Sequence, residues 1–193
     1  ITEIWFDIDR SVILTPSSEA ATILFWGDAS YDRGTDTLLE AIPKVLECFP
    51  NTNFVLSIRD YGPTYREKIK KFAKTYPIKI LNYPYNQHVS EIVFSADIIV
   101  LPYNATTMYP PLTLAESLLV GNSVITTDVE ANKELIGDNT RGILIEPRNS
   151  DKLARVIIDL LSDEEKRREI TARARSFIYN TYNWDDVVKK VLN

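Results

Sequence analysis

Residues 96–127, ADIIVLPYNATTMYPPLTLAESLLVGNSVITT, contain the alternation that decides the fold. The branched and apolar run 98–101 has the length and composition of a strand buried on both faces. A loop that ends in two prolines follows, and apolar residues from Leu112 onward are spaced as in a helix. Gly121 predicts the end of that helix, and the next apolar run begins at Val124. The stretch therefore predicts a strand, a loop, a helix and a second strand.

Glu116 lies in the first turns of this otherwise apolar helix, and two interpretations of it stay open. A carboxylate near the start of a helix is favoured by the positive end of the helix dipole. Alternatively, Glu116 contacts a ligand, because open α/β sheets bind ligands at the carboxyl ends of their strands. The chemistry of the residue alone favours the structural interpretation.

The same alternation continues along the chain. Short apolar runs predict six strands, separated by helical patterns, at residues 23–26, 54–57, 78–81, 98–101, 123–126 and 143–145. Such strands form a parallel sheet covered on both faces, and right-handed crossovers make it doubly wound. The sequence thus predicts an α/β, Rossmann-like domain in residues 22–193. Residues 1–21 lack a clear period and are expected to form a hinge or linker.

The sequence also makes local predictions. Thr37 with Glu40, and Ser162 with Glu165, have the spacing of capping boxes at helix starts. Cys48 lies in a helical pattern and is expected to be a small buried hydrophobe.

The composition is that of an ordinary globular protein, with 45% hydrophobic and 25% charged residues among 193. A net charge of −5 without a basic cluster argues against nucleic acid as a main partner. The longest apolar runs are too short to cross a membrane, and no signal peptide is recognised. One His and one Cys leave no His/Cys zinc site, and His88 alone leaves little for a histidine-based triad.

Several motifs occur in a characteristic order. Residues 27–34 resemble the pattern G-R-x-x-x-x-K-G, and residues 96–103 resemble A-D, an apolar run and P-S, with Tyr103 in place of the serine. Glu116 stands for the second glutamate of E-x7-E, and residues 134–147 resemble E-L-I, a short gap and G-x-L-x-x-P. Over nearly the whole chain these motifs resemble the C-terminal, donor-binding half of GT-B glycosyltransferases, specifically glycosyltransferase family 4.

This resemblance implies where a nucleotide-sugar donor would bind. Glu116 stands where the family's second glutamate holds the ribose hydroxyls. Arg33 keeps the charge of a lysine that contacts the donor diphosphate, and Gly27 ends the strand that precedes it. The amides of Leu112 and Thr113 at the helix start would also stabilise the diphosphate.

Other positions of the proposed donor site depart from the family. The first glutamate of E-x7-E is Met108, so a polar contact with the donor sugar is lost. Pro111 replaces a glycine and has no N–H to offer a phosphate. Asp28 replaces an arginine, so with Arg33 the net charge of the pair is 0 instead of +2. Arg33 is also the nearest candidate in sequence to pair with Asp28.

The resemblance implies a glycosyltransferase that uses a nucleotide-diphosphate sugar as its substrate donor for an unknown acceptor. It implies a retaining reaction without a bound metal or other cofactor, because positive groups of the protein would stabilise the leaving diphosphate. No catalytic residue is assigned. The acceptor-binding half would lie outside this chain, and the expected location is cytoplasmic, with any peripheral membrane contact made through that half.

Two alternatives to this enzyme stay open. The first is a non-catalytic binding or assembly module that keeps the fold but has lost the donor site, which Met108, Pro111 and Asp28 favour. The second is a related GT-B enzyme, a nucleotide-sugar epimerase or a phosphorylase.

Smaller features add further expectations. Asp7-Ile8-Asp9 is a D-x-D, which holds a divalent metal in some sugar transferases, but without a preceding strand and helix the linker interpretation is favoured. Trp184 and a last helix at 185–192 are expected to reach toward the missing half. Near the strand ends, a set of tyrosines either stacks on a base or sugar or lies half exposed in loops: Tyr83, Tyr85, Tyr103 and Tyr109.

Overall fold

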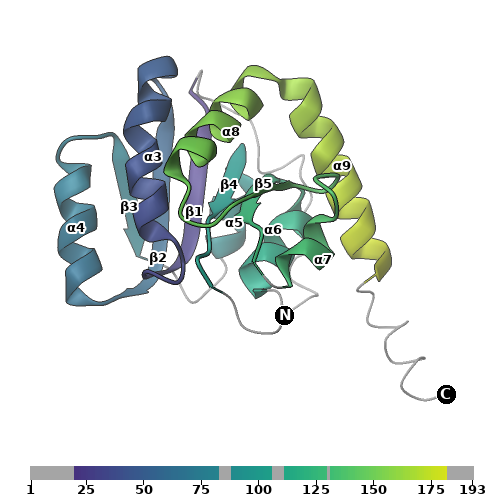
Figure 1. The fold of residues 1–193 in the computed structure, drawn as a ribbon, viewed down its shortest axis with the longest axis horizontal. Coiled ribbons are helices and arrows are strands. Elements are labelled where there is room, and N and C mark those ends of the chain that lie inside the picture. Colours follow the sequence, from purple (N-terminus) through teal and green to yellow (C-terminus); the bar gives the residue numbers. More distant parts are fainter. Residues whose placement is uncertain (1–19, 83–87, 106–110, 130, 182–193) are drawn as a thin grey trace, which may run out of the picture.

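The computed structural model describes residues 20–82, 88–105, 111–129 and 131–181 of the chain. Its centre is a sheet of six parallel strands in the order β3-β2-β1-β4-β5-β6 (Figure 1). The strands are β1 (Thr22–Ala29), β2 (Asn53–Tyr61), β3 (Ile78–Asn82), β4 (Ile98–Leu101), β5 (Ser123–Thr127) and β6 (Ile143–Ile145). Each overlaps a predicted strand, so the predicted Rossmann-like α/β fold is confirmed.

Helices cover both faces of this sheet. In the described ranges they are α3 (Thr35–Cys48), α4 (Pro63–Ala73), α5 (His88–Phe94), α6 (Leu112–Val120), α7 (Asn132–Ile136), α8 (Ser150–Ser162) and α9 (Glu164–Thr181). Apolar side chains of α3, α4 and α8 form one core with the strands, on the face toward the viewer in Figure 1. Those of α5, α6, α7 and α9 form a second core on the opposite face. Burial on both faces explains why the strands are continuous apolar runs.

The strand order reverses between β1 and β4, which is where a crevice opens in folds of this kind. The two strands pair through Ile23 with Ile98 and Leu24 with Ile99. Beyond Leu24, β1 continues to Ala29 along β2, with an irregularity in the register between Gly27 and Ala29. The carboxyl end of β1 therefore has β2 on one side and leaves room on the side of β4.

The predicted capping boxes are wrong. Helix α3 has Gly34 at its N-cap without a side-chain cap, and Thr37 is already inside the helix. At α9 the cap is Asp163, whose carboxylate accepts a hydrogen bond from the amide of Lys166 at 2.9 Å. Ser162 instead donates its hydroxyl to a carbonyl within α8. In both cases the helix starts at a residue that the capping-box spacing did not indicate.

Cys48 was expected to be buried, but its side chain is exposed. It is the last residue of α3, and the buried residues of that helix end at Val45. The apolar stripe therefore stops before the cysteine, which lies on the solvent side of the final turn.

Other predictions concern residues outside the described ranges. These include Asp7-Ile8-Asp9 and nearly all of the hinge at residues 1–21, Met108, three of the tyrosines, and Trp184 with the helix after it. Within the part of the chain that the structure describes, no helix has the length and apolar character needed to cross a membrane.

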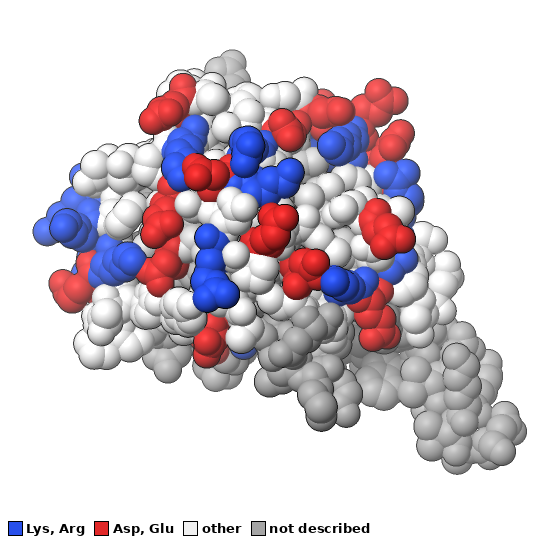
Figure 2. Space-filling model, viewed as in Figure 1, with Lys and Arg blue, Asp and Glu red and all other residues white. Residues whose placement is uncertain are grey.

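Surface charges alternate in sign over the face that carries α3, α4 and α8. Figure 2 shows Lys and Arg side chains interspersed with Asp and Glu side chains there. One cross-helix pair on this face joins Lys44 of α3 to Asp151 of α8 at 2.7 Å. On this face the described residues offer no large basic patch of the kind that binds nucleic acid.

Candidate functional site

A pocket of about 230 Å³ opens at the point where the strand order reverses. Its walls come from the end of β1, the β1–α3 loop, the segment after β4 and the start of α6. They consist of Phe25, Trp26, Gly27, Asp28, Arg33, Tyr103, Pro111, Leu112 and Thr113. The pocket therefore lies at the carboxyl edge of the sheet, where ligands bind in open α/β folds.

Five residues that the sequence predicts as donor-binding line this pocket together: Gly27, Asp28, Arg33, Leu112 and Thr113. Two further residues were predicted to bind the donor. Glu116 lies one helical turn after Leu112 and Thr113, half-buried and outside the lining. Met108 lies outside the described residues.

The β1–α3 loop is fixed against the segment that follows β4. Asn104 donates its amide to the carbonyl of Asp32 at 2.8 Å and its side-chain amide to the carbonyl of Tyr31 at 2.7 Å. Gly34 has φ +67°, and a Cβ at that position would lie 1.6 Å from the carbonyl oxygen of Pro102. Only a residue without a side chain allows this approach of two backbones. The loop that carries Arg33 is thereby held in place.

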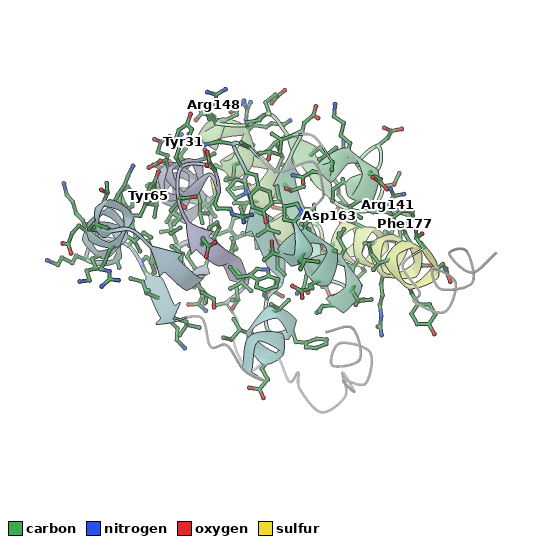
Figure 3. All side chains as sticks on the ribbon, turned by 90° about the horizontal axis from the view of Figure 1, so that it is seen from below. Tyr31, Tyr65, Arg141, Arg148, Asp163 and Phe177 are labelled. Carbon is green, nitrogen blue, oxygen red and sulfur yellow. The ribbon has the colours of Figure 1, made fainter. Side chains whose placement is uncertain are left out.

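A second contact joins the β1–α3 loop to the segment after β6, the strand at one edge of the sheet. Arg148 follows β6, and its guanidinium donates to the hydroxyl of Tyr31 at 3.4 Å. Figure 3 shows the two side chains next to one another. Both are exposed, so this contact contributes little to stability.

Tyr103 is the buried centre of the pocket wall, with only 1% of its surface exposed. Its hydroxyl lies 2.6 Å from the hydroxyl oxygen of Thr113 in the first turn of α6. The guanidinium carbon of Arg33 lies 5.2 Å from the centre of its ring, within the range of a cation–π contact. Burial raises the pKa of Tyr103, so its hydroxyl stays neutral. From the sequence, this tyrosine was expected either to stack on a base or sugar or to lie half exposed in a loop. The structure instead shows a buried ring in contact with Arg33.

The first turn of α6 presents backbone donors to the pocket. The amides of Leu114 and Ala115 bond to the carbonyl of Pro111, and the helix has no side-chain cap. Amides at the start of a helix have no carbonyl partner within it, and the helix dipole adds partial positive charge there. The helix start and Arg33 thus make this end of the pocket positive, and Asp28 adds a negative charge to the lining.

A buried hydrogen-bond chain ties α6 to β1. The indole N–H of Trp26 donates to the hydroxyl of Ser117 at 3.0 Å, and that hydroxyl donates to the carbonyl of Thr113 at 2.6 Å. Trp26 and Ser117 are both buried. The sequence did not indicate this chain, because nothing in the spacing of the two residues reveals that they meet.

Comparison with known proteins assigns a family. The sequence model described as "Glycosyl transferases group 1" matches residues 9–177. The chain belongs to this family. It is 28% identical over 177 residues to an uncharacterised glycosyltransferase of Methanocaldococcus jannaschii, covering 89% of this chain and 43% of that protein. It is 25% identical over 177 residues to the phosphatidyl-myo-inositol mannosyltransferase of Mycolicibacterium smegmatis, covering 90% and 44%.

Solved structures show the same fold. The C-terminal domain of a group 1 glycosyl transferase from Francisella tularensis matches with a TM-score of 0.73 and 20% identity, over 91% of this chain and 98% of that one. HepE of Anabaena, crystallised with UDP-glucose, matches with a TM-score of 0.76 and 17% identity, over 90% and 48%. This group 1 chain thus corresponds in fold to a C-terminal domain, and it spans about half the length of the curated relatives it matches.

The carboxyl group of Glu116 lies near the pocket of this group 1 domain. Burial raises the pKa of Glu116 to about 7, so the group is about half ionised at neutral pH. In a helix, positions three and four residues apart share a face, which places Glu116 beside Thr113 and Leu112. A carboxyl group with such a pKa next to a pocket is a candidate for ligand contact, although structural groups are perturbed as well.

A second pocket, of about 380 Å³, lies at the carboxyl ends of β5 and β6, away from the point of reversal. Its walls carry charges of both signs, and Lys133 and Asp128 pair across part of it at 2.7 Å. In the described ranges of the chain, no three His, Cys, Asp or Glu side chains gather as metal ligands.

Proposed function

We propose that this chain is the donor-binding domain of a glycosyltransferase that takes its sugar from a nucleotide diphosphate. One observation carries the proposal: the pocket at the strand reversal brings Arg33 together with the N-terminal turn of α6. A cation beside the N-terminal amides of a helix suits a diphosphate. Membership of the group 1 family supports it, and HepE, a structural neighbour, was crystallised with UDP-glucose.

The proposed chemistry needs a stabilised leaving group. When the sugar leaves, negative charge develops on the diphosphate, and donors already fixed around it lower the barrier. Arg33 and the amides of Leu112 and Thr113 would supply those donors here, so we propose a reaction without a bound metal. We also propose that the sugar keeps its anomeric configuration and that Glu116 accepts hydrogen bonds from the ribose. The acceptor would bind to a half outside this chain, with residues 1–21 as the hinge and the cytoplasm as the site of action.

Replacing Arg33 with alanine tests the proposal. We expect the affinity for UDP and GDP to fall about tenfold, because one charge-assisted contact is lost while the helix amides remain. The affinity for the bare nucleosides should not change. Isothermal titration of both proteins with both kinds of ligand gives the answer. If wild type binds no diphosphate with either base, the donor-domain proposal fails.

Asp28 favours the second candidate function, a module that keeps the fold without a working donor site. Its carboxylate lines the pocket in which the proposed diphosphate would lie. Two unit charges about 4 Å apart interact by roughly 1 kcal/mol in water and about 4 kcal/mol at an effective dielectric constant of 20. Unless its charge is paired, a carboxylate at that distance would therefore weaken the binding of a second anion.

We expect Asp28→Asn to tighten the binding of UDP several-fold and to leave uridine unaffected. The gain should shrink at high salt, because ions screen the repulsion. Titrations at low and high salt measure both effects. Equal UDP affinities in the two proteins would place Asp28 away from the phosphates, whereas no binding by either protein would favour the module.

A further inference from the structure

The pocket wall contains a side chain whose contacts reach two different binding elements. Tyr103 contacts Arg33 through its ring face, at 5.2 Å from the ring centre, and Thr113 through its hydroxyl, at 2.6 Å. Arg33 comes from the β1–α3 loop and Thr113 from the first turn of α6. These are the two elements that would bind a diphosphate, and Tyr103 touches both at once.

Tyr103 itself is held rigidly. Its ring is 1% exposed, and its backbone carbonyl accepts a hydrogen bond from the hydroxyl of Thr127 in β5 at 2.5 Å. The residue before it, Pro102, is in contact with Gly34, and the residue after it, Asn104, is hydrogen-bonded to the β1–α3 loop. The ring therefore has one position, set from the sheet and from the loop.

Arg33 differs in this respect, because it has a long side chain and is only partly buried. A guanidinium of this kind loses conformational freedom when it binds an anion, and that loss reduces affinity. An aromatic face that attracts the cation limits its positions before the ligand arrives. The physical reason for a fixed ring beneath Arg33 is thus preorganisation of the charge.

We propose that Tyr103 is a positioning residue, whose ring holds the Arg33 guanidinium at the pocket and whose hydroxyl holds the first turn of α6. Resting on the proposed function, this makes diphosphate affinity dependent on a side chain that need not touch the ligand. The hydroxyl also interacts with the Arg33 side chain, so variants are needed to separate the ring from the hydroxyl. Tyr103→Phe keeps the ring, and Tyr103→Leu removes it.

The first experiment is a double-mutant cycle between Tyr103 and Arg33, read out as the affinity for UDP. We expect Tyr103→Leu to weaken UDP binding about threefold to tenfold when Arg33 is present. In the Arg33→Ala background, Tyr103→Leu and Tyr103→Phe should differ in affinity by less than twofold, because both lack the hydroxyl and the cation that the ring positions is gone. Tyr103→Phe should retain most of the Arg33-dependent affinity.

Phe54→Leu serves as the matched control. Phe54 is another buried aromatic residue, 1% exposed, but it lies in the core on the other face of the sheet and does not line the pocket. It should lower stability without changing UDP affinity. If Tyr103→Leu weakens UDP binding equally with and without Arg33, the proposed positioning role is wrong.

A second measurement needs no ligand and therefore separates this inference from the proposed function. The side-chain Nε–H signal of Arg33 in a ¹H–¹⁵N spectrum can be assigned by its loss in Arg33→Lys. Tyr103→Leu should shift and broaden this signal, because the ring current and the restraint disappear. Tyr103→Phe keeps the ring and loses only the interaction of the hydroxyl with Arg33, so it should change the signal less. An Arg33 signal that does not respond to Tyr103→Leu overturns the inference even if UDP binds. A response in a wild-type chain that binds no UDP supports the positioning and rejects only the proposed function.

Discussion

Gly34→Ala should lower the free energy of unfolding by about 2–5 kcal/mol. The residue has φ +67°, and a left-handed conformation costs an L-residue roughly 1–2 kcal/mol. The added methyl would also lie 1.6 Å from the carbonyl oxygen of Pro102, and forcing atoms into a packed site costs about 1–3 kcal/mol more. Relief would require the β1–α3 loop to move away from the segment after β4. Urea unfolding followed by circular dichroism measures the change.

Gly62→Ala is the matched control for this substitution. Gly62 has φ −57°, and a Cβ there would meet no atom within 4 Å. Its replacement should change the free energy of unfolding by less than about 1 kcal/mol, because two small effects oppose each other. Alanine lowers the conformational entropy of the unfolded chain, which stabilises the fold, but it is a slightly poorer helix cap than glycine. Equal stability of Gly34→Ala and wild type would contradict the close approach of the loop to Pro102.

The strands could be predicted because their burial leaves a direct trace in the sequence. Runs such as 98–101 are apolar at every position, which occurs when both faces of a parallel sheet are covered. The order of the strands in the sheet is harder to predict, because it requires the handedness of the crossovers and the resemblance to a known family in addition to the apolar runs. The structure confirms the predicted fold class, with six parallel strands in one sheet.

Helix starts were harder to predict, because tertiary contacts decide them. At α3 the spacing of Thr37 and Glu40 suggested a cap, but the chain enters the helix where Gly34 packs on Pro102. That contact joins residues far apart in sequence and leaves no periodic signal. Cys48 shows the same limit at the other end of the helix, where the apolar stripe stops one turn early.

Some features of the candidate site could likewise be predicted from the sequence, and others could not. Gly27 and Thr113 could be placed together from the sequence, because the ends of parallel strands and the following helix starts meet at one edge of the sheet. The burial of Tyr103 and the bond from Trp26 to Ser117 could not be predicted. They depend on how side chains pack between elements, which local spacing does not encode.

Glu116→Ala should weaken the binding of UDP-glucose by about 10- to 150-fold at pH 8. A hydrogen bond to a charged group contributes about 1.5–3 kcal/mol, and the proposed ribose contact would be lost completely. Glu40→Ala is the control, because Glu40 is an exposed glutamate inside α3 and lies outside the pocket. It should bind as wild type does.

The pH dependence makes this prediction specific to the carboxyl group. Burial raises the pKa of Glu116 to about 7, so the group is almost fully ionised at pH 8 and only about a tenth ionised at pH 6. The ribose hydroxyls would donate to the ionised form, so wild-type affinity should fall roughly tenfold from pH 8 to pH 6. UDP-glucose is the suitable ligand, because its diphosphate does not itself titrate in this range. Glu116→Gln should remove the pH dependence, and a wild-type affinity that stays constant across this range would assign Glu116 to structure instead of to the ribose.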